Sequence, residues 1–482
     1  MAHVTSENAL NVVFQKHLPP PPIHLILLGA DIARNAAVLG ALGYQVNSAS
    51  FETPQVFAPL HSGKRPGTYQ VNLALPGDMV ASCGAAVVTD FSPELHPLAL
   101  FDQLALWLAD GATVVLAERK PTLTEPRVKQ WLRYVDAIGA RCGFIREEFV
   151  PSVMDDGDVF VHKFRKKNPP RWQLRHMRPG DFAEIAVLFQ EVFGHPLSRE
   201  LWEWKYANGR GNAVLASRRG TLVAHYGGMY REILLRGKPD WAYGGSDVMV
   251  HPNERGVMTK QGPFLLTAAT TAEIYGPVAY GFPTERAMLV AERMGLYSKA
   301  GRMAEVRWQP SAPRPRLRTR VRALVQGNAT DQALADGVWR AMAHDLRDGV
   351  VGVRDWKYLE QRYFAHPHNQ YEVLAVVSRF TGKAMGVMVM RRLEGSCELL
   401  DVIAPLAKLA LVIDQARRLT KRWALPYLYC WITTNYASVL VACGGKDQEL
   451  NVFIPTSCWT DDPRVDMVKG RWWLTSGDTD FR

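Results

Sequence analysis

The sequence predicts an α/β protein made of three successive domains, and three observations support this. At 482 residues and 54.0 kDa the chain is too long for one hydrophobic core. Short apolar runs alternate with helical stretches along the first third, which is typical of a parallel sheet covered by helices. Two basic, proline-containing segments, 163–170 and 310–327, interrupt the later pattern. We therefore expect domains at residues 1–165, 171–309 and 328–482.

The composition is that of an ordinary folded protein. Hydrophobic residues make up 47% of the chain and charged residues 22%, which excludes a mainly disordered chain. The net charge of +10 comes from Lys and Arg scattered along the sequence, so a small anionic ligand accounts for it as well as nucleic acid would. We expect no nucleic-acid partner.

Cysteine spacing and hydropathy narrow the classes further. None of the six cysteines forms a CxxC pair or a Cys/His cluster with zinc-ligand spacing, so we expect free thiols and no metal. No run approaches the roughly 18 apolar residues that span a bilayer, and the first residues do not resemble a signal peptide. The sequence predicts a cytoplasmic protein without a membrane span.

The first domain is predicted from its alternating elements. The expected strands are 23–28, 44–46, 85–88 and 113–117, with helices reaching Leu42 and covering 98–108. This order, with Asp90 after the third of these strands, resembles a class I S-adenosylmethionine-dependent methyltransferase and implies a Rossmann-like fold. The turn after the first strand holds one glycine, Gly29, where a cofactor needs several for the backbone to approach it. We expect a degenerate domain and do not expect S-adenosylmethionine as cofactor.

The second domain is predicted as a mixed sheet with helices. A strand at 173–176 precedes a helix whose apolar residues form one stripe between Phe182 and Phe193. The remaining expected elements are a hairpin over 214–226, a strand at 241–250, a helix opened by Pro263, a strand at 278–282 and a helix capped by Thr284.

Three ordered motifs in this block carry a resemblance to a known family. They are Val250-His251-Pro252-Asn253-Glu254-Arg255-Gly256, Tyr280-Gly281-Phe282-Pro283-Thr284 and Met294-Gly295-Leu296-Tyr297. With the order of strands and helices, they resemble the GNAT N-acyltransferase superfamily over roughly 130 residues. The resemblance implies a bacterial-type acyltransferase that binds an acyl-CoA, such as acetyl-CoA.

The third domain repeats the second. Thr434, Ala437, Leu440 and Gly445 fall 150 positions after Thr284, Ala287, Val290 and Gly295. The segment that starts at Asp401 likewise echoes the one that starts at Asp247. Agreement in order and spacing indicates a duplication. Trp204-Lys205-Tyr206 also recurs as Trp356-Lys357-Tyr358, but its spacing to the next strand differs, so it does not carry this argument. The repeat has no Arg-Gly after Pro405, so we expect a second, degenerate GNAT-like domain without an acyl-donor site.

The resemblance implies an acyl-donor site between two strands that separate. In this family the pyrophosphate rests on backbone N–H groups that open the following helix, where unpaired donors and the helix dipole favour an anion. Mapped here, the strands are 241–250 and 278–282, and a backbone N–H of Val248 or Val250 would stabilise the oxyanion. The site residues that the resemblance implies are Val248, Met249, Val250, Arg255, Gly256, Val257, Met258, Thr259, Lys260, Gln261 and Gly262.

The loop from Arg255 to Gly262 departs from the family pattern. Met258 and Lys260 occupy positions where glycine usually gives the backbone room to close on phosphates. Lys260 and Thr259 could hold a phosphate through charge and a hydroxyl instead. A solvated loop on a retired acyltransferase is the competing interpretation.

The candidates for deprotonating an incoming ammonium are Glu203, Asp247 and His251, although His251, before Pro252, could be a loop residue. Asp247 lies inside an expected strand, where an ionised carboxylate needs a partner, and is the first candidate for the base. Glu203, between two tryptophans, is a candidate for an acceptor wall, although it could also belong to an aromatic packing cluster. Tyr297 is the candidate for reprotonating the leaving thiolate; a core tyrosine is the alternative.

The sequence therefore predicts transfer of an acyl group, expected to be acetyl, from acyl-CoA to a primary amine of a small molecule or sugar. No nucleophilic Cys or Ser constellation is present, so direct attack by the amine is expected. Two alternatives remain. One is a non-catalytic binding or scaffold protein, and the other is an S-adenosylmethionine-dependent methyltransferase in the first domain. Oligomeric state, acyl length and acceptor identity do not follow from the sequence.

Overall fold

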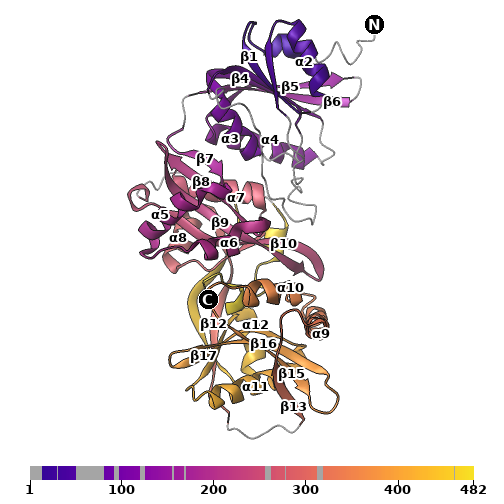
Figure 1. The fold of residues 1–482 in the computed structure, drawn as a ribbon, viewed down its shortest axis with the longest axis vertical. Helices are drawn as coiled ribbons and strands as arrows, with labels where there is room; N and C mark the ends of the chain where they lie inside the picture. Colours follow the sequence, from indigo (N-terminus) through magenta and orange to yellow (C-terminus); the bar gives the residue numbers. More distant parts are fainter. Residues whose placement is uncertain are drawn as a thin grey trace.

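The computed structural model shows three α/β parts that follow one another along the long axis of the molecule (Figure 1). It describes residues 13–29, 31–49, 81–91, 97–119, 125–154, 157–167, 170–255, 262–276, 278–311, 318–460 and 462–481. The mixed α/β class expected from the sequence is confirmed. Within these ranges, no helix is both long and apolar enough to cross a membrane.

The N-terminal part is a six-stranded sheet in the order β2-β1-β3-β4-β6-β5. Its strands are β1 (His24–Leu28), β2 (Gln45–Ala49), β3 (Cys83–Phe91), β4 (Leu108–Arg119), β5 (Phe144–Met154) and β6 (Gly157–Lys166), and its helices are α2 (Ile32–Ala41), α3 (Pro97–Trp107) and α4 (Glu125–Arg141). Strands β1 to β4 are parallel, and β6 runs antiparallel to both neighbours. This arrangement is compatible with a Rossmann-like sheet. The closer resemblance to methyltransferases stays a prediction.

The central sheet is built around a long antiparallel pair, β9 (Thr221–Leu235) and β10 (Lys238–Val250). Also in this part are β7 (Gln173–His176), β8 (Gly211–Arg218), β11 (Ala279–Tyr280), α5 (Phe182–Phe193), α6 (Arg199–Tyr206), α7 (Pro263–Tyr275) and α8 (Glu285–Arg293). Each corresponds to an element expected from the sequence, except for the short α6. The Thr284 side chain caps α8 by accepting from the backbone N–H of Ala287, as the sequence predicts.

The C-terminal sheet has seven strands in the order β13-β15-β16-β17-β18-β12-β19. They are β12 (Tyr297–Trp308), β13 (Thr319–Ala323), β15 (Glu372–Ser378), β16 (Ala384–Leu393), β17 (Ser396–Ile403), β18 (Leu428–Thr433) and β19 (Lys446–Ser457), with helices α9 (Ala329–Asp345), α10 (Trp356–Leu359), α11 (Leu409–Arg422) and α12 (Thr434–Val441). A π-helical turn, η5 (Glu360–Phe364), continues α10.

The two sheets exchange strands across the expected boundary near residue 309. Strand β12, which follows α8 directly, lies between β18 and β19 of the C-terminal sheet. In return, β14 (Val350–Gly352) pairs with the end of β9, and β20 (Trp472–Trp473) pairs with β14. The limits 171–309 and 328–482 stay predictions for the chain segments. The hydrogen-bonded sheets, however, do not follow those limits.

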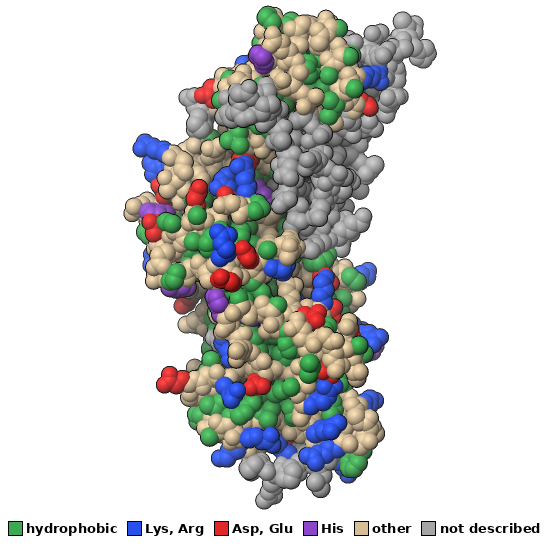
Figure 2. Space-filling view, viewed as in Figure 1, with side chains coloured by type: hydrophobic (Ala, Val, Ile, Leu, Met, Phe, Trp, Pro, Cys, Tyr) green, Lys and Arg blue, Asp and Glu red, His purple; other side chains and the backbone are tan. Residues whose placement is uncertain are grey.

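Basic side chains do not form one continuous surface on the face shown in Figure 2. They appear there in separate groups, the largest over the C-terminal part. The six cysteines are free thiols, four of them buried.

Candidate functional site

The two strands β10 and β11 separate soon after they pair. Their parallel register holds only Tyr243 opposite Ala279 and Gly244 opposite Tyr280. A Cβ atom at Gly244 would lie 2.9 Å from the Tyr280 hydroxyl, so glycine permits this close approach. This opening is where the resemblance to the family implies the acyl donor.

A bulge in β10 follows the point of separation. The register with β9 moves from Ser246 opposite Gly227 to Met249 opposite His225, which leaves Asp247 and Val248 together opposite one residue. Asp247 has a φ of 48°, in the left-handed region that side chains rarely adopt. The bulge takes Val248 out of the regular ladder, which suits the backbone role expected of it.

A buried charge cluster holds this bulge. Lys205 Nζ lies 2.8 Å from Asp247 Oδ1 and 2.7 Å from Asp480 Oδ2, and the Tyr206 hydroxyl donates to Asp247 Oδ2 over 2.8 Å. Lys205 and Asp247 side chains are only 4% and 7% exposed, so their charges are compensated inside the protein. His225 Nδ1 lies 2.7 Å from the carbonyl oxygen of Asp247 and fixes the backbone.

The cluster keeps its charges over a wide pH range. Burial opposes ionisation of Asp247, but the charge of Lys205 outweighs it and lowers the pKa of the carboxyl. Burial also opposes the charge of Lys205, but Asp247 and Asp480 together raise its pKa. For His225 burial dominates and lowers the pKa, which favours the neutral ring.

Tyr297 has a different hydrogen-bond partner from those of Asp247. It is the first residue of β12, and its hydroxyl hydrogen-bonds that of Tyr226, whose ring packs near Phe264 of α7. Burial raises the pKa of Tyr226 to about 12 and that of Tyr297 well above its usual value, so both remain protonated at neutral pH. Tyr297 is thus linked through Tyr226 to Phe264 of α7, whereas Asp247 is bonded to Lys205 and Tyr206 of α6.

The expected phosphate loop is described only at its ends. Arg255 Nε donates to the carbonyl of Val250 over 2.9 Å. Gly262 is the N-cap residue of α7, with Pro263 at the first helical position. The residues between, Gly256, Val257, Met258, Thr259, Lys260 and Gln261, lie outside the described residues. Met249 is buried in the core, so only its backbone could face a ligand.

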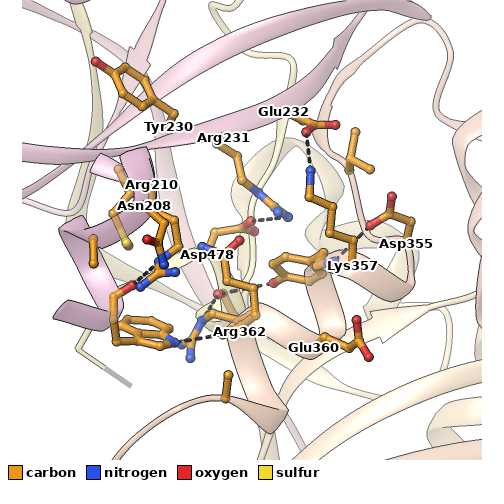
Figure 3. Close-up of a pocket in the computed structure, with 18 of the residues that line it drawn as sticks. Asn208, Arg210, Tyr230, Arg231, Glu232, Asp355, Lys357, Glu360, Arg362 and Asp478 are labelled. Carbon is orange, nitrogen blue, oxygen red and sulfur yellow. Dashed lines mark hydrogen bonds and ion pairs between the residues drawn. The ribbon is translucent and has the colours of Figure 1, made fainter. Parts of the chain in front are cut away.

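A cavity of about 780 Å³ lies between the central and C-terminal sheets (Figure 3). Its walls come from α6 and strands β9 to β11 on one side and from α10, η5 and the chain end on the other. Glu203, half exposed on α6, and Tyr280 of β11 lie on the first side. Asp478 and Thr479, next in sequence to Asp480 of the charge cluster, lie on the other side. Volume and position suit a small ligand reaching toward the separated strands.

The C-terminal half contains a second version of the Asp247 arrangement. The Tyr358 hydroxyl donates to Asp401 Oδ2 over 2.7 Å, just as Tyr206 does to Asp247. Both tyrosines belong to the recurring Trp-Lys-Tyr segments, so the structure supports the repeat. The cation that pairs with the aspartate differs between the two halves. Arg354 Nε donates to Asp401 Oδ1 over 2.9 Å, whereas Lys357, the lysine of the second Trp-Lys-Tyr segment, is exposed.

The chain end fills the opening between β17 and β18. These strands pair only at Cys397 opposite Leu428 and Glu398 opposite Tyr429. Beyond that point the Thr475 hydroxyl bonds Asp401 over 3.0 Å, and the carbonyl of Leu474 accepts from the Thr433 N–H. The space that corresponds to the expected donor site is therefore occupied by protein.

Several residues of the site were not found by sequence reasoning. Lys205 belongs to the recurring Trp-Lys-Tyr segment, but nothing in that segment indicates that it pairs with Asp247, and the cavity arginines Arg231 and Arg362 belong to no motif. The two chain-end carboxylates Asp478 and Asp480, close together in one short segment, are the signal that could have pointed to the cluster. Among the described residues there is no group of three or more His, Cys, Asp or Glu side chains that could hold a metal.

Comparisons with known proteins point to one family. A family model described as an acetyltransferase (GNAT) domain matches residues 173–299. No curated protein matches the chain. Among solved structures, a probable N-acyltransferase from Enterococcus faecalis is 13% identical, with a TM-score of 0.47 over 59% of this chain and 72% of that one.

Two further structures are similar at the same low level. A tandem GNAT protein from the clavulanic acid biosynthesis pathway has 11% identity and a TM-score of 0.40, covering 60% of this chain and all of its own. Saccharomyces cerevisiae N-myristoyltransferase has the same identity and score, covering 60% and 80%. With TM-scores below 0.5, these similarities say nothing of substrate or activity.

Proposed function

Residues 173–299 form a GNAT acetyltransferase domain, and from this premise we propose that the chain transfers an acyl group, acetyl by expectation, from acyl-CoA to a primary amine of a small molecule or sugar. The observation that carries the proposal is the bulge at Asp247–Val248, beside the opening of β10 and β11 and next to the interdomain cavity. The donor would lie in the opening and the acceptor in the cavity.

In this proposal, binding of the acyl-CoA depends on the start of α7. A 13-residue helix with Gly262 as its N-cap offers unpaired N–H groups and a partial positive charge to a diphosphate. Arg255 lies at the other end of the same loop, and Lys260 would add a positive charge. The bulky Met258 and Lys260 in place of glycine are the main argument against binding, so this loop is the part to test.

The reaction can be written with the residues in hand. The amine nitrogen attacks the thioester carbonyl carbon, the backbone N–H of Val248 stabilises the oxyanion, and the C–S bond breaks as the nitrogen gives its second proton to solvent and the amide forms. Glu203, which borders the cavity, is our candidate for taking the proton of the incoming ammonium. Tyr297 stays the candidate proton donor for the thiolate.

Asp247 suits positioning better than base catalysis. Lys205 and Tyr206 occupy both of its oxygens, and its lowered pKa makes it a weak proton acceptor. Its role in the proposal is to hold the bulge that presents Val248. This departs from the role that the sequence suggested for Asp247.

Calorimetry with acetyl-CoA and with S-adenosylmethionine tests the proposal. We expect binding of acetyl-CoA that is lost in Lys260→Glu. The matched control is Lys408→Glu, the same charge change in the exposed loop before α11 of the C-terminal repeat, which should leave binding unchanged. Silence with both ligands would support the scaffold alternative, and a response to S-adenosylmethionine alone would support the methyltransferase.

A further inference from the structure

The turn between β15 and β16 presents an aromatic ring to solvent. Phe380 lies in this turn and is 79% exposed, more than any other large hydrophobic side chain that the structure describes. Hydrogen bonds close the turn: the Ser378 N–H donates to the carbonyl of Lys383 over 2.9 Å, and the Gly382 N–H donates to that of Ser378 over 3.1 Å. Gly382 has a φ of 67°, which glycine adopts without strain. An ordered turn therefore keeps in water a ring that folding normally buries.

Four exposed cations lie in this turn or in the segment bonded to it. Arg379 and Lys383 belong to the turn, Arg318 immediately precedes β13, and Arg320 belongs to β13. The Arg379 N–H donates to the carbonyl of Arg318 over 3.0 Å, and Arg379 Nε donates to the carbonyl of Thr319 over 3.0 Å. Strand β13 is at the edge of the C-terminal sheet. The ring and the four cations thus share one edge of that sheet.

No carboxylate balances this charge. The two segments, 318–321 and 378–385, contain four cations and no acidic residue, which gives them a net formal charge of +4. None of the four forms an ion pair with a residue that the structure describes, whereas the next basic residue of β13, Arg322, pairs with Asp331 and is not counted. An anionic partner would therefore meet charges that are free to pair with it.

Helix α11 extends the basic surface. Gln415 Nε2 donates to the Thr319 hydroxyl over 2.7 Å, which directs this face of the helix toward β13. Arg418 and Arg422 follow three and seven residues later, on the same face. The acidic residue of the helix, Asp414, already pairs with a neighbouring arginine. Strand β13 and helix α11 lie at the end of the molecule opposite the N-terminal part (Figure 1), and Figure 2 shows basic side chains gathered there.

We propose that this end of the C-terminal part docks on an anionic membrane surface. The ring of Phe380 enters the boundary between headgroups and acyl chains, and the four cations beside it contact acidic headgroups. Peripheral binding of this kind grows with the apolar area that enters the bilayer and with the number of basic residues near it. The surface provides both contributions on neighbouring segments.

Nucleic acid is the other polyanion that the charge alone would attract. Binding of a single strand without sequence preference relies on aromatic side chains on which successive bases stack. The segments 318–321 and 378–385 contain one aromatic residue, Phe380. A single exposed ring between cations suits insertion into a bilayer better than stacking along a strand.

Sedimentation with sucrose-loaded vesicles tests the proposal on the full chain. We expect binding to phosphatidylcholine vesicles that contain about 30% phosphatidylserine, at least about tenfold weaker binding to phosphatidylcholine alone, and release as the salt concentration rises to about 0.5 M. Equal binding to both kinds of vesicle, or binding to neither, would overturn the proposal.

Phe380→Ala and Lys383→Glu separate the apolar and the electrostatic contributions. We expect each to weaken binding to the acidic vesicles by about fivefold or more, since a partly inserted ring and one basic residue each contribute about that factor. The controls are Phe193→Ala on α5 and Lys446→Glu at the start of β19, on the opposite edge of the same sheet. Both should bind as the native chain does. Unchanged binding in the two turn variants, or an equal loss in the controls, would refute the assigned surface.

Fluorescence anisotropy with a labelled single-stranded oligonucleotide distinguishes the two polyanions. At about 0.15 M salt we expect the acidic vesicles to bind and the oligonucleotide to bind more weakly or not at all. Oligonucleotide binding without vesicle binding would overturn the proposal and assign the surface to nucleic acid. Neither measurement involves a thioester, so the outcome is independent of the proposed acyl transfer.

Discussion

Asp247 and Asp401 hold corresponding places in the two halves of the chain, yet their environments differ. Asp247 receives the hydroxyl of Tyr206, while Asp401 Oδ2 receives those of both Tyr358 and Tyr363, each over 2.7 Å. Their cations differ too: Lys205 pairs with Asp247, and the buried Arg354 pairs with Asp401. Asp247 therefore receives one tyrosine hydroxyl where Asp401 receives two.

Tyr206→Phe and Tyr358→Phe form a matched pair that tests this difference. Loss of a hydrogen bond to a buried charged group typically costs about 1.5–3 kcal/mol of unfolding free energy. We expect Tyr206→Phe to show a loss in that range and Tyr358→Phe a smaller one, because Tyr363 still donates to Asp401. Urea unfolding at pH 7 measures both. A larger loss in Tyr358→Phe would contradict the assignment.

The pH dependence of the Asp247 cluster follows from the direction of its pKa shifts. A carboxyl with a lowered pKa stabilises the folded state fully above its unfolded value of 3.8, and the contribution is lost as pH falls through the folded pKa. Lys205, with a raised pKa, contributes below 10.5 and loses its contribution as pH rises through the folded value. His225, whose lowered pKa keeps the ring neutral, costs stability as pH falls below its unfolded value of 6.5, so the stabilisation is constant only between about pH 7 and 9.

Asp247→Asn tests that constancy. We expect its melting temperature to lie below that of the native chain by the same amount throughout about pH 7 to 9, and the gap to narrow below the unfolded pKa of 3.8. Thermal melts in a series of buffers give the comparison. A gap that changes around neutral pH would mean that another titrating group controls the bulge.

At the scale of elements, the chain end ties the two sheets together. Trp472 and Trp473 form β20 of the central sheet, Thr475 bonds Asp401, and Asp480 reaches Lys205. The backbone passes close to Asp401 at Gly477: a Cβ atom there would lie 2.6 Å from Asp401 Oδ2 and 2.2 Å from the Tyr363 hydroxyl. The path of the chain end therefore requires a residue without a side chain at position 477.

Gly477→Ala is expected to destabilise the chain end. The added methyl group would displace Asp401 or the chain, and overpacking of this kind costs about 1–3 kcal/mol. The control is Gly337→Ala inside α9, where no atom lies within 4 Å of the new Cβ and helix propensity predicts a gain of up to about 1 kcal/mol. Equal melting temperatures for the two variants would contradict this view of Gly477.

Sequence reasoning predicted elements far better than their partners. Strands β7 to β10, helices α5, α7 and α8, and the cap at Thr284 follow from local periodicity and capping residues. The exchange of β12, β14 and β20 does not, because strand pairing between distant segments leaves no local pattern. For the site, Glu203 and Asp247 could be named as polar residues in apolar surroundings. Lys205 could not, since its partner Asp480 lies 275 residues away.

The whole molecule is held together by shared cores and by exchanged strands. Arg141 of the N-terminal part pairs with Glu273 of α7 over 2.5 Å, and Trp459 donates to the same carboxylate over 2.7 Å. Apolar residues of the N-terminal sheet and the central sheet form one buried cluster, to which the central sheet contributes Leu174 and Val214. The proposed donor and acceptor sites therefore depend on parts that lie far apart in sequence.

This interdependence predicts how fragments behave. The segment 171–309 contains the whole family match, but it lacks β14 and β20 and leaves β12 without β18 and β19. Unpaired strand edges with apolar faces favour aggregation. We expect 171–309 to aggregate or to lack a cooperative melt, whereas 171–482, which keeps both exchanges, folds with a lower melting temperature than the full chain because Arg141 is missing. Gel filtration and circular-dichroism melts of both fragments give the answer. A monomeric, cooperatively melting 171–309 would show that the exchanged strands are dispensable for the central fold.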